Sequence, residues 1–344
     1  MSNRKEREHG AGSPGRFRRL YLLGQPRRTS LVLLIASIVA AAAMLAVADA
    51  PTVDSRDAHL TSPAPLEGAC PIFPANNPLN QEIAHAPVNP NSAKYIESIG
   101  ADIHLHADFG TPPNYGIPYV VVGPHQPRVP IHFTEYGEES NPGPYPIPPN
   151  APVEGAGEEG DRHVLVLQEG VCKLYELYSA QRTASGWAAG SGAVFNLRSN
   201  KLRPEGWTSA DAAGLPIFPL LARYPEVKSG QIDHALRVTV PATQRGYIHP
   251  ATHYASSSSD PALPPMGLRL RLKASFDLSG YHGQALVVLR ALKRYGLIVA
   301  DNGSPWYITG APNPAWNNED LDQLKRVPGS EFEAVSTGPI LHHG

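Results

Sequence analysis

Carboxylates, an imidazole and a phenol recur at alternate positions in one short stretch of the chain. If Glu169–Gly170 forms a two-residue turn between two strands, His163 lies opposite Glu176 and Asp161 lies opposite Tyr178. Because side chains alternate between the two faces of a strand, all four then lie on one face of the hairpin. A half-buried carboxylate beside an imidazole has a pKa that its surroundings can shift, which suits general acid–base catalysis. The competing interpretation is an ordinary cross-strand ion pair on a solvated face.

Other carboxylates complete the set of candidate catalytic groups. Hydrolysis of a glycosidic bond commonly uses two carboxyl groups roughly 5 to 9.5 Å apart across a groove, a spacing that one sequence does not reveal. The candidate acids and bases are Glu176, His163, Asp161, Asp211, Asp277 and Asp301.

A possible metal site lies in the run His104-Leu105-His106-Ala107-Asp108. In a strand, the period of two sends His104, His106 and Asp108 to the same side. Three such ligands could hold a zinc ion with an open position, which makes a metal-dependent hydrolase one hypothesis. The alternative is a simple turn, with close histidines arising by chance among the 14 in the chain. No other cofactor is predicted.

The run from Leu268 to Leu278 alternates apolar with polar side chains. Its apolar side would face a core, while Arg269, Arg271 and Lys273 would form a basic face able to grip an anionic sugar polymer. Lysine and arginine also protect edge strands from pairing with other chains, which is the competing explanation.

Aromatic side chains add candidate sugar-binding surfaces, because an aromatic face contacts the apolar face of a pyranose. The candidates are Trp207, Trp306 and Tyr178, although the position of Trp306 in a predicted hairpin favours the core. The chain has no G-x-S-x-G elbow, P-loop, dinucleotide-binding glycine motif or H-E-x-x-H. The corresponding hydrolases, nucleotide enzymes and metalloproteases therefore lose support.

Short strand-like runs separated by Pro- or Gly-rich turns must position these groups. The chain has 36 prolines, 31 glycines and 42% apolar residues. Together with the strand-like runs, this composition predicts a mostly β fold with a buried core, either a single β-sandwich or a distorted barrel. The runs are Ile117–Val122, Val129–Phe133, His163–Leu167, Cys172–Tyr178, Ala193–Leu197, Leu236–Val240 and Leu268–Phe276.

The apolar period changes from two to that of a helix near the C-terminus. Ala285, Val288, Leu289 and Leu292 share one helical face, and the helix is expected to end at Gly296. A hairpin with a type I′ turn around Asn302-Gly303 should follow. A second short helix, capped by Asn317 or Asn318, comes next. One or two C-terminal helices thus pack on the predicted sheet.

The N-terminal part of the chain has the features of an export segment. Residues 1–28 are rich in Lys and Arg, residues 29–50 are long and apolar enough to cross a bilayer, and residues 51–68 lack an apolar period. We expect a basic cytoplasmic tail, then a transmembrane anchor or a cleaved signal peptide, then a flexible linker. After the linker, we expect residues 69–344 to form an extracytoplasmic domain that is either secreted or anchored to the membrane.

The two cysteines fit an oxidising compartment. Cys70 and Cys172 lie 102 residues apart, and neither belongs to a metal-ligand pair of cysteines. A disulfide between them is predicted, with two buried free thiols as the alternative.

Three longer runs together resemble a family of secreted bacterial proteins of unassigned activity. They are GWTSADAAGLPIFPLLARY (206–224), PPMGLRLRLKASFDLSGY (264–281) and ALKRYGLIVADNGSPWYITGAP (291–312), and the resemblance covers nearly all of residues 69–335. It implies export and a single domain, and it brings no functional residues.

The sequence favours an exported cell-envelope protein that acts on polysaccharide as a glycoside hydrolase or lyase. The alternatives are a non-catalytic glycan-binding or wall-associated protein and the metal-dependent hydrolase. The part of the chain after the basic tail is net acidic, which argues against nucleic acid as a partner. A cell-wall glycan and, through the N-terminal segment, the membrane are the expected partners.

Overall fold

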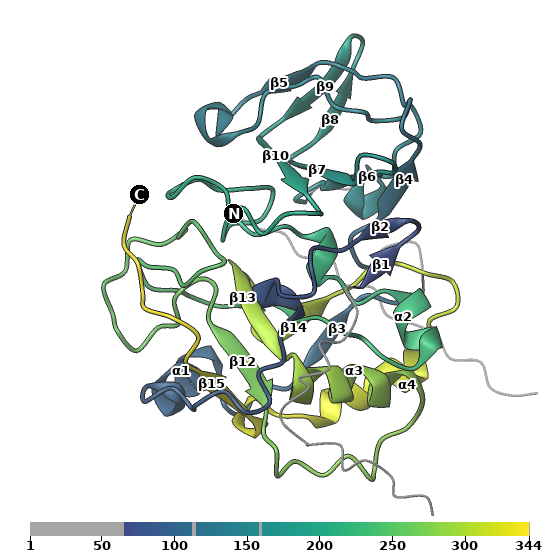
Figure 1. Ribbon diagram of the computed structural model, residues 1–344. Helices are drawn as coiled ribbons and strands as arrows, with labels where there is room; N and C mark the ends of the chain where they lie inside the picture. The colour runs from purple at the N-terminus through teal and green to yellow at the C-terminus, as the bar shows by residue number, and fades with distance from the viewer. Residues whose placement is uncertain (1–64, 112–114, 158–159, 344) are drawn as a thin grey trace, which may run out of the picture. The chain divides into compact units, whose positions relative to one another are not determined.

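The computed structural model describes residues 65–111, 115–157 and 160–343 (Figure 1). The chain divides into two units, Met1–Ala58 and His59–Gly344, and the first lies wholly outside these ranges.

The predicted export features mostly fall outside the same ranges. These are the basic tail over 1–28, the membrane or signal segment over 29–50 and the linker as far as residue 64. Within the described ranges, no helix has the length and apolar character needed to cross a membrane.

The fold is mostly β, as expected. The strands of the described residues form four sheets, so that the expected single sandwich or distorted barrel is not confirmed. The largest is a six-stranded mixed sheet in the order β15 (Phe332–Val335), β12 (Arg269–Leu272), β13 (Leu297–Asn302), β11 (Leu236–Val240), β14 (Tyr307–Thr309) and β3 (His106–Asp108).

The smaller sheets come mainly from the first half of the described chain (Figure 1). A four-stranded sheet has the order β10 (Ser191–Asn196), β7 (Lys173–Tyr178), β6 (Val164–Gln168) and β4 (Tyr119–Val122), and a three-stranded sheet the order β5 (Ile131–Phe133), β9 (Gly186–Ala189) and β8 (Gln181–Thr183). The short strands β1 (Leu66–Glu67) and β2 (Cys70–Pro71) pair with each other, so that ordered structure reaches into the predicted linker.

Four α-helices occur in the described residues: α1 (Ser92–Ile99), α2 (Tyr224–Ser229), α3 (Gly283–Arg294) and α4 (Asn318–Asp322). The predicted apolar face of α3 is fully buried or nearly so, and the helix contacts β12. Asn317 is the cap of α4, because its side chain accepts hydrogen bonds from the main-chain N–H groups of Glu319 and Asp320. Single 3₁₀ turns lie at η1 (Pro78–Asn80), η2 (Gly137–Glu139), η3 (Glu154–Gly157), η4 (Phe218–Leu220), η5 (Gln323–Arg326) and η6 (Gly329–Glu331).

The hairpin of β6 and β7 separates two hydrophobic clusters. Leu165, Leu167 and Leu174 belong to the larger cluster, which also contains the apolar side chains of β11 to β14. Val164 and Val166, which alternate with them, belong to the smaller one. Both faces of β6 are therefore buried, and a polar side chain on the same face as Leu165 must find its partners inside the protein.

The predicted register of this hairpin is wrong by two residues. Leu165, and not His163, lies opposite Glu176, because residues 169–172 form a four-residue connection in place of the two-residue turn. Cys172 has a left-handed backbone conformation (φ 49°) there and forms the predicted disulfide with Cys70. A shift of two leaves the faces unchanged, so that His163 and Glu176 still share a side.

The predicted hairpin around Asn302-Gly303 is also wrong. β13 and β14 do not pair with each other, since β11 lies between them, parallel to β13 and antiparallel to β14. Four of the five residues of β11 are buried, and a strand of this kind suits a central place in a sheet. Asp301 and Asn302 consequently continue β13 and do not form a turn.

Candidate functional site

A cavity of about 480 Å³ gathers most of the predicted catalytic groups. It lies where β7, β10 and β13 begin or end, beside the loop of residues 208–212. Its wall carries three carboxyl groups and three phenols, together with two imidazoles: Asp161, Asp211, Asp301, Tyr136, Tyr178, Tyr254, His163 and His253. Five of these eight were predicted from the sequence. Long-range folding, and not the hairpin alone, brings them together.

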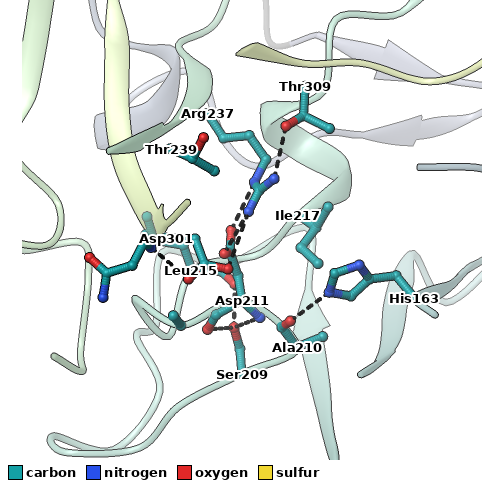
Figure 2. A network of polar contacts seen from close by, with 12 residues as sticks. His163, Ser209, Ala210, Asp211, Leu215, Ile217, Arg237, Thr239, Asp301 and Thr309 are labelled. Atoms are coloured by element: carbon teal, nitrogen blue, oxygen red, sulfur yellow. Dashed lines mark hydrogen bonds and ion pairs between the residues drawn. The ribbon is translucent and has the colours of Figure 1, made fainter. Parts of the chain in front are cut away.

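Arg237 is the central cation of the site (Figure 2). Its Nη2 and Nε donate to the two carboxylate oxygens of Asp211 at 2.8 and 3.1 Å, and its Nη1 donates to Thr309 Oγ1 at 2.8 Å. Arg237 and Asp211 are both almost completely buried. A buried pair with two parallel bonds fixes the orientation of the carboxylate and occupies both of its oxygens.

Asp301 lies beside this pair but interacts only weakly with the Arg237 guanidinium group. Its Oδ2 is 3.9 Å from Arg237 Nη2, and its Oδ1 accepts a hydrogen bond from its neighbour's main-chain N–H at 2.7 Å. Burial and the charge of Asp211 raise the pKa of Asp301 to about 7, against the lowering effect of Arg237. Asp301 is thus a carboxyl group that holds a proton near neutral pH and faces the cavity.

A β-bulge places Asp301 there. The parallel register of β11 and β13 pairs Val238 with Val299 and then Thr239 with Asp301, so that Ala300 is the extra residue. Without the bulge, Ala300 would stand level with Thr239, and Asp301 would point to the other side of the sheet. The irregularity turns an acidic side chain onto the face that carries Arg237.

His163 is held as an imidazolium between two acceptors. Its Nδ1 donates to Glu154 Oε2 at 2.6 Å and its Nε2 to the main-chain oxygen of Ala210 at 2.9 Å. Burial opposes the charge, but Glu154 outweighs this and raises the pKa of His163 to about 9. Since both ring nitrogens are occupied, His163 fixes the loop that carries Asp211 and does not serve as a base.

The same loop is held by a serine at its centre. Ser209 Oγ donates to the main-chain oxygen of Leu215 and accepts from the N–H of Asp211 at 2.9 Å. Ser191 Oγ, at the start of β10, donates to the main-chain oxygen of Ser209 at 2.7 Å. The loop is therefore tied to the four-stranded sheet through Ser191 and does not depend on Arg237 alone for its position.

Glu176 lies behind the cavity and not in its wall. The side chain has no exposed surface, and its oxygens accept from the main-chain N–H groups of Ile217 and Phe218 at 2.8 to 3.0 Å. Burial, which the two N–H groups only partly offset, raises the pKa of Glu176 to about 7. The predicted partner His163 contacts Glu154 instead, so that Glu176 serves here as an anchor for η4.

Three other predicted residues lie away from the cavity. Asp277 is exposed and accepts from Ser279. Trp306 is completely buried, stacks on Phe332 and donates from its indole nitrogen to a main-chain oxygen, which corresponds to the core alternative. Trp207 is half-buried beneath a guanidinium group and does not line the cavity.

The predicted metal site does not form. The described residues contain no group of three His, Cys, Asp or Glu side chains placed to hold a metal ion. The Nδ1 of His104 is bonded to the main-chain oxygen of Lys325, and the ring of His106 stacks on Tyr307. His106 and Asp108 remain close enough for their charges to interact, but His104 is bonded elsewhere and the three side chains do not form a ligand set.

The predicted basic face is not open to solvent. β12 is an inner strand, and Arg269 and Arg271 are only 2% and 8% exposed. Arg269 donates to the main-chain oxygens of Pro78 and Tyr295, and Arg271 to those of residues 83, 84 and 86 and to Glu333. Lys273 donates to Ser330. The chain before α1 covers this face, and neither an exposed basic surface nor edge protection describes it.

Sequence reasoning missed Arg237, Glu154, His253 and the phenols of Tyr136 and Tyr254. Arg237 had left a signal, because it is the one cation in the otherwise apolar or neutral run Leu236–Val240. An arginine in a buried strand requires a buried partner. No comparable sequence signal marks Glu154.

In comparisons with known proteins, no family model, curated protein or solved structure matches the chain.

Proposed function

We propose that the protein is a glycoside hydrolase that acts on polysaccharide outside the cytoplasm, with Asp301 as its general acid. One observation carries the proposal: a carboxyl group whose pKa is about 7 faces a cavity rimmed by phenols. Cleavage of a glycosidic bond needs such a protonated acid to donate to the leaving oxygen.

The other carboxyl groups take different roles. Asp211 has both oxygens bound to Arg237, and its charge keeps the proton on Asp301. Asp161 is exposed at the cavity wall, and its carboxylate is the group available to activate water or to attack the sugar carbon. Tyr136 and Tyr178 offer ring faces and hydroxyl groups to a sugar, and Tyr254 lines the same cavity with its hydroxyl group bonded to Arg245 Nε.

The extracytoplasmic location rests on two supports. The Cys70–Cys172 disulfide suits an oxidising compartment, and the sequence of residues 1–50 has the charge and apolar pattern of an export segment.

The test is release of new reducing ends from a panel of neutral, acidic and amino-sugar polysaccharides. We expect one of them to be cleaved, and Asp301→Asn to lower the rate by a factor of about 100 or more, as loss of a general acid does. Asp277→Asn is the matched control, because Asp277 is exposed and outside the cavity, and it should keep the wild-type rate. Equal rates for Asp301→Asn and wild type would contradict the proposal.

The second candidate function is glycan binding without cleavage. It is favoured by the same three phenols, which serve a binding site as well as an active site. Retention of a polysaccharide by the wild-type protein without new reducing ends would support this candidate and remove the catalytic one.

A further inference from the structure

We infer that the cavity selects a sugar unit that carries a protonated amine, as in a de-acetylated amino-sugar polymer, over one that carries a carboxylate. The inference rests on the proposed function, since it names the substrate class of the same site. It follows from the charges and hydrogen-bond partners in the cavity wall.

The wall supplies negative charge, and its second imidazole, His253, is bonded through Nδ1 to the main-chain oxygen of Ala212 at 2.6 Å. Its described residues include three aspartates and neither lysine nor arginine. Arg237 lies behind the wall and is engaged by Asp211 and Thr309. His163 is engaged at both nitrogens by Glu154 and Ala210. Each of these two cations is thus matched by one carboxylate. Asp301 holds a proton near neutral pH, which leaves Asp161 as the charged acidic group of the wall without a cation of its own.

A second observation concerns an acceptor that lacks a donor. Asn302 lines the same cavity, and its side-chain Oδ1 is buried with no hydrogen-bond partner among the described residues. A buried acceptor without a partner costs free energy, and a ligand that brings a donor removes this cost. The unmatched groups of the cavity are therefore oxygens that accept hydrogen bonds, contributed by Asp161 and Asn302.

The two sugar classes differ in what they bring to such a wall. An ammonium group has three N–H donors and a positive charge, which complement acceptors and carboxylates. The carboxylate of a uronate has only acceptors and a negative charge, and it would need an arginine or a lysine. The arginines that sequence analysis had offered for this purpose, Arg269 and Arg271, are bonded to main-chain oxygens elsewhere in the fold.

Calorimetric titration with oligomers of matched length tests the inference independently of catalysis. The probes are oligomers of glucosamine, N-acetylglucosamine and galacturonic acid, at a mildly acidic pH. We expect the glucosamine oligomer to bind most tightly, and its affinity to fall as salt is added. The N-acetylated oligomer should bind more weakly and with little salt dependence.

Two variants separate the acidic wall from the charge of the whole protein. Asp161→Asn should lower the affinity for the glucosamine oligomer by about threefold to tenfold and leave that for the N-acetylated oligomer unchanged. Asp277→Asn removes an equal charge outside the cavity and should change neither. Equal losses in the two variants would overturn the inference.

The remaining outcomes keep the two proposals apart. The inference is overturned if the galacturonate oligomer binds tightly. It is also overturned if the protein cleaves another polysaccharide but does not bind the glucosamine oligomer. In both cases the proposal of hydrolysis remains. Preferential binding of the glucosamine oligomer without any cleavage supports the inference and overturns hydrolysis.

Discussion

Arg237 binds Asp211 through two parallel hydrogen bonds, whereas the same Nη2 atom lies 3.9 Å from Asp301. One buried cation therefore neutralises one of two neighbouring carboxyl groups almost completely and the other only weakly. This asymmetry separates the two acids. Asp211 becomes the permanent partner of the cation, and Asp301 keeps its proton to a pH near neutrality.

Removal of the cation should leave a buried charge without a partner. We expect Arg237→Met to lower the free energy of unfolding by about 3 to 5 kcal/mol, measured by urea denaturation. The double variant Arg237→Met with Asp211→Asn should recover a large part of this loss, because it removes the stranded carboxylate as well. Strict additivity of the two single variants would show that the pair is not coupled.

Glu176 should make the protein less stable as the pH rises towards neutrality. Its pKa is raised from 4.5 to about 7 in the folded protein, so the folded state keeps a proton that the unfolded chain loses. The free energy of unfolding therefore falls between pH 4.5 and 7, by up to about 3 kcal/mol from this group. Glu176→Gln should flatten that slope, and an unchanged slope would mean that Glu176 titrates normally.

His163 should produce a loss of stability at higher pH. Its pKa is raised from 6.5 to about 9, so its contribution is complete below pH 6.5 and is lost as the pH rises through 9. We expect the wild-type free energy of unfolding to decline between pH 7.5 and 9, above the range in which Asp301 and Glu176 titrate. His163→Gln should remove this decline, and persistence of the decline in the variant would assign it to another group.

The cations in and directly after β12 should matter for folding in proportion to their burial. Arg271→Gln removes donors to three main-chain oxygens and to Glu333, and we expect a loss of about 2 to 4 kcal/mol in unfolding free energy. Lys273→Gln, directly after the strand and half-exposed, is the control and should cost less than about 1 kcal/mol. Similar small losses in both would contradict the buried position of Arg271.

Local sequence patterns predicted those features that depend on local physics. The alternation of β6 and β7, the apolar face of α3 and the cap at Asn317 each follow from a period or a turn within a few residues. The Cys70–Cys172 disulfide could be predicted because the chain offers only one possible pair.

Features that depend on distant partners could not be predicted in the same way. Asn302-Gly303 has the sequence of a hairpin turn, but β11 takes the place between β13 and β14 because it needs neighbours on both edges. The bulge at Ala300 decides which way Asp301 points, and no local signal announces it. The basic alternation of β12 looked like a solvated face because the segment that covers it lies far away in the sequence.

The pH dependence of kcat/KM on the cleaved polysaccharide tests the central claim most directly. If Asp301 is the general acid, the rate falls as the pH rises through about 7, since the proton that it donates is then lost. Asp301→Asn should abolish this fall in kcat/KM near pH 7 and most of the rate itself. Asp277→Asn should keep both the wild-type rate and its fall near pH 7. A rate that stays constant from pH 6 to 9, or a fall near pH 7 that persists in Asp301→Asn, would contradict the assignment of Asp301.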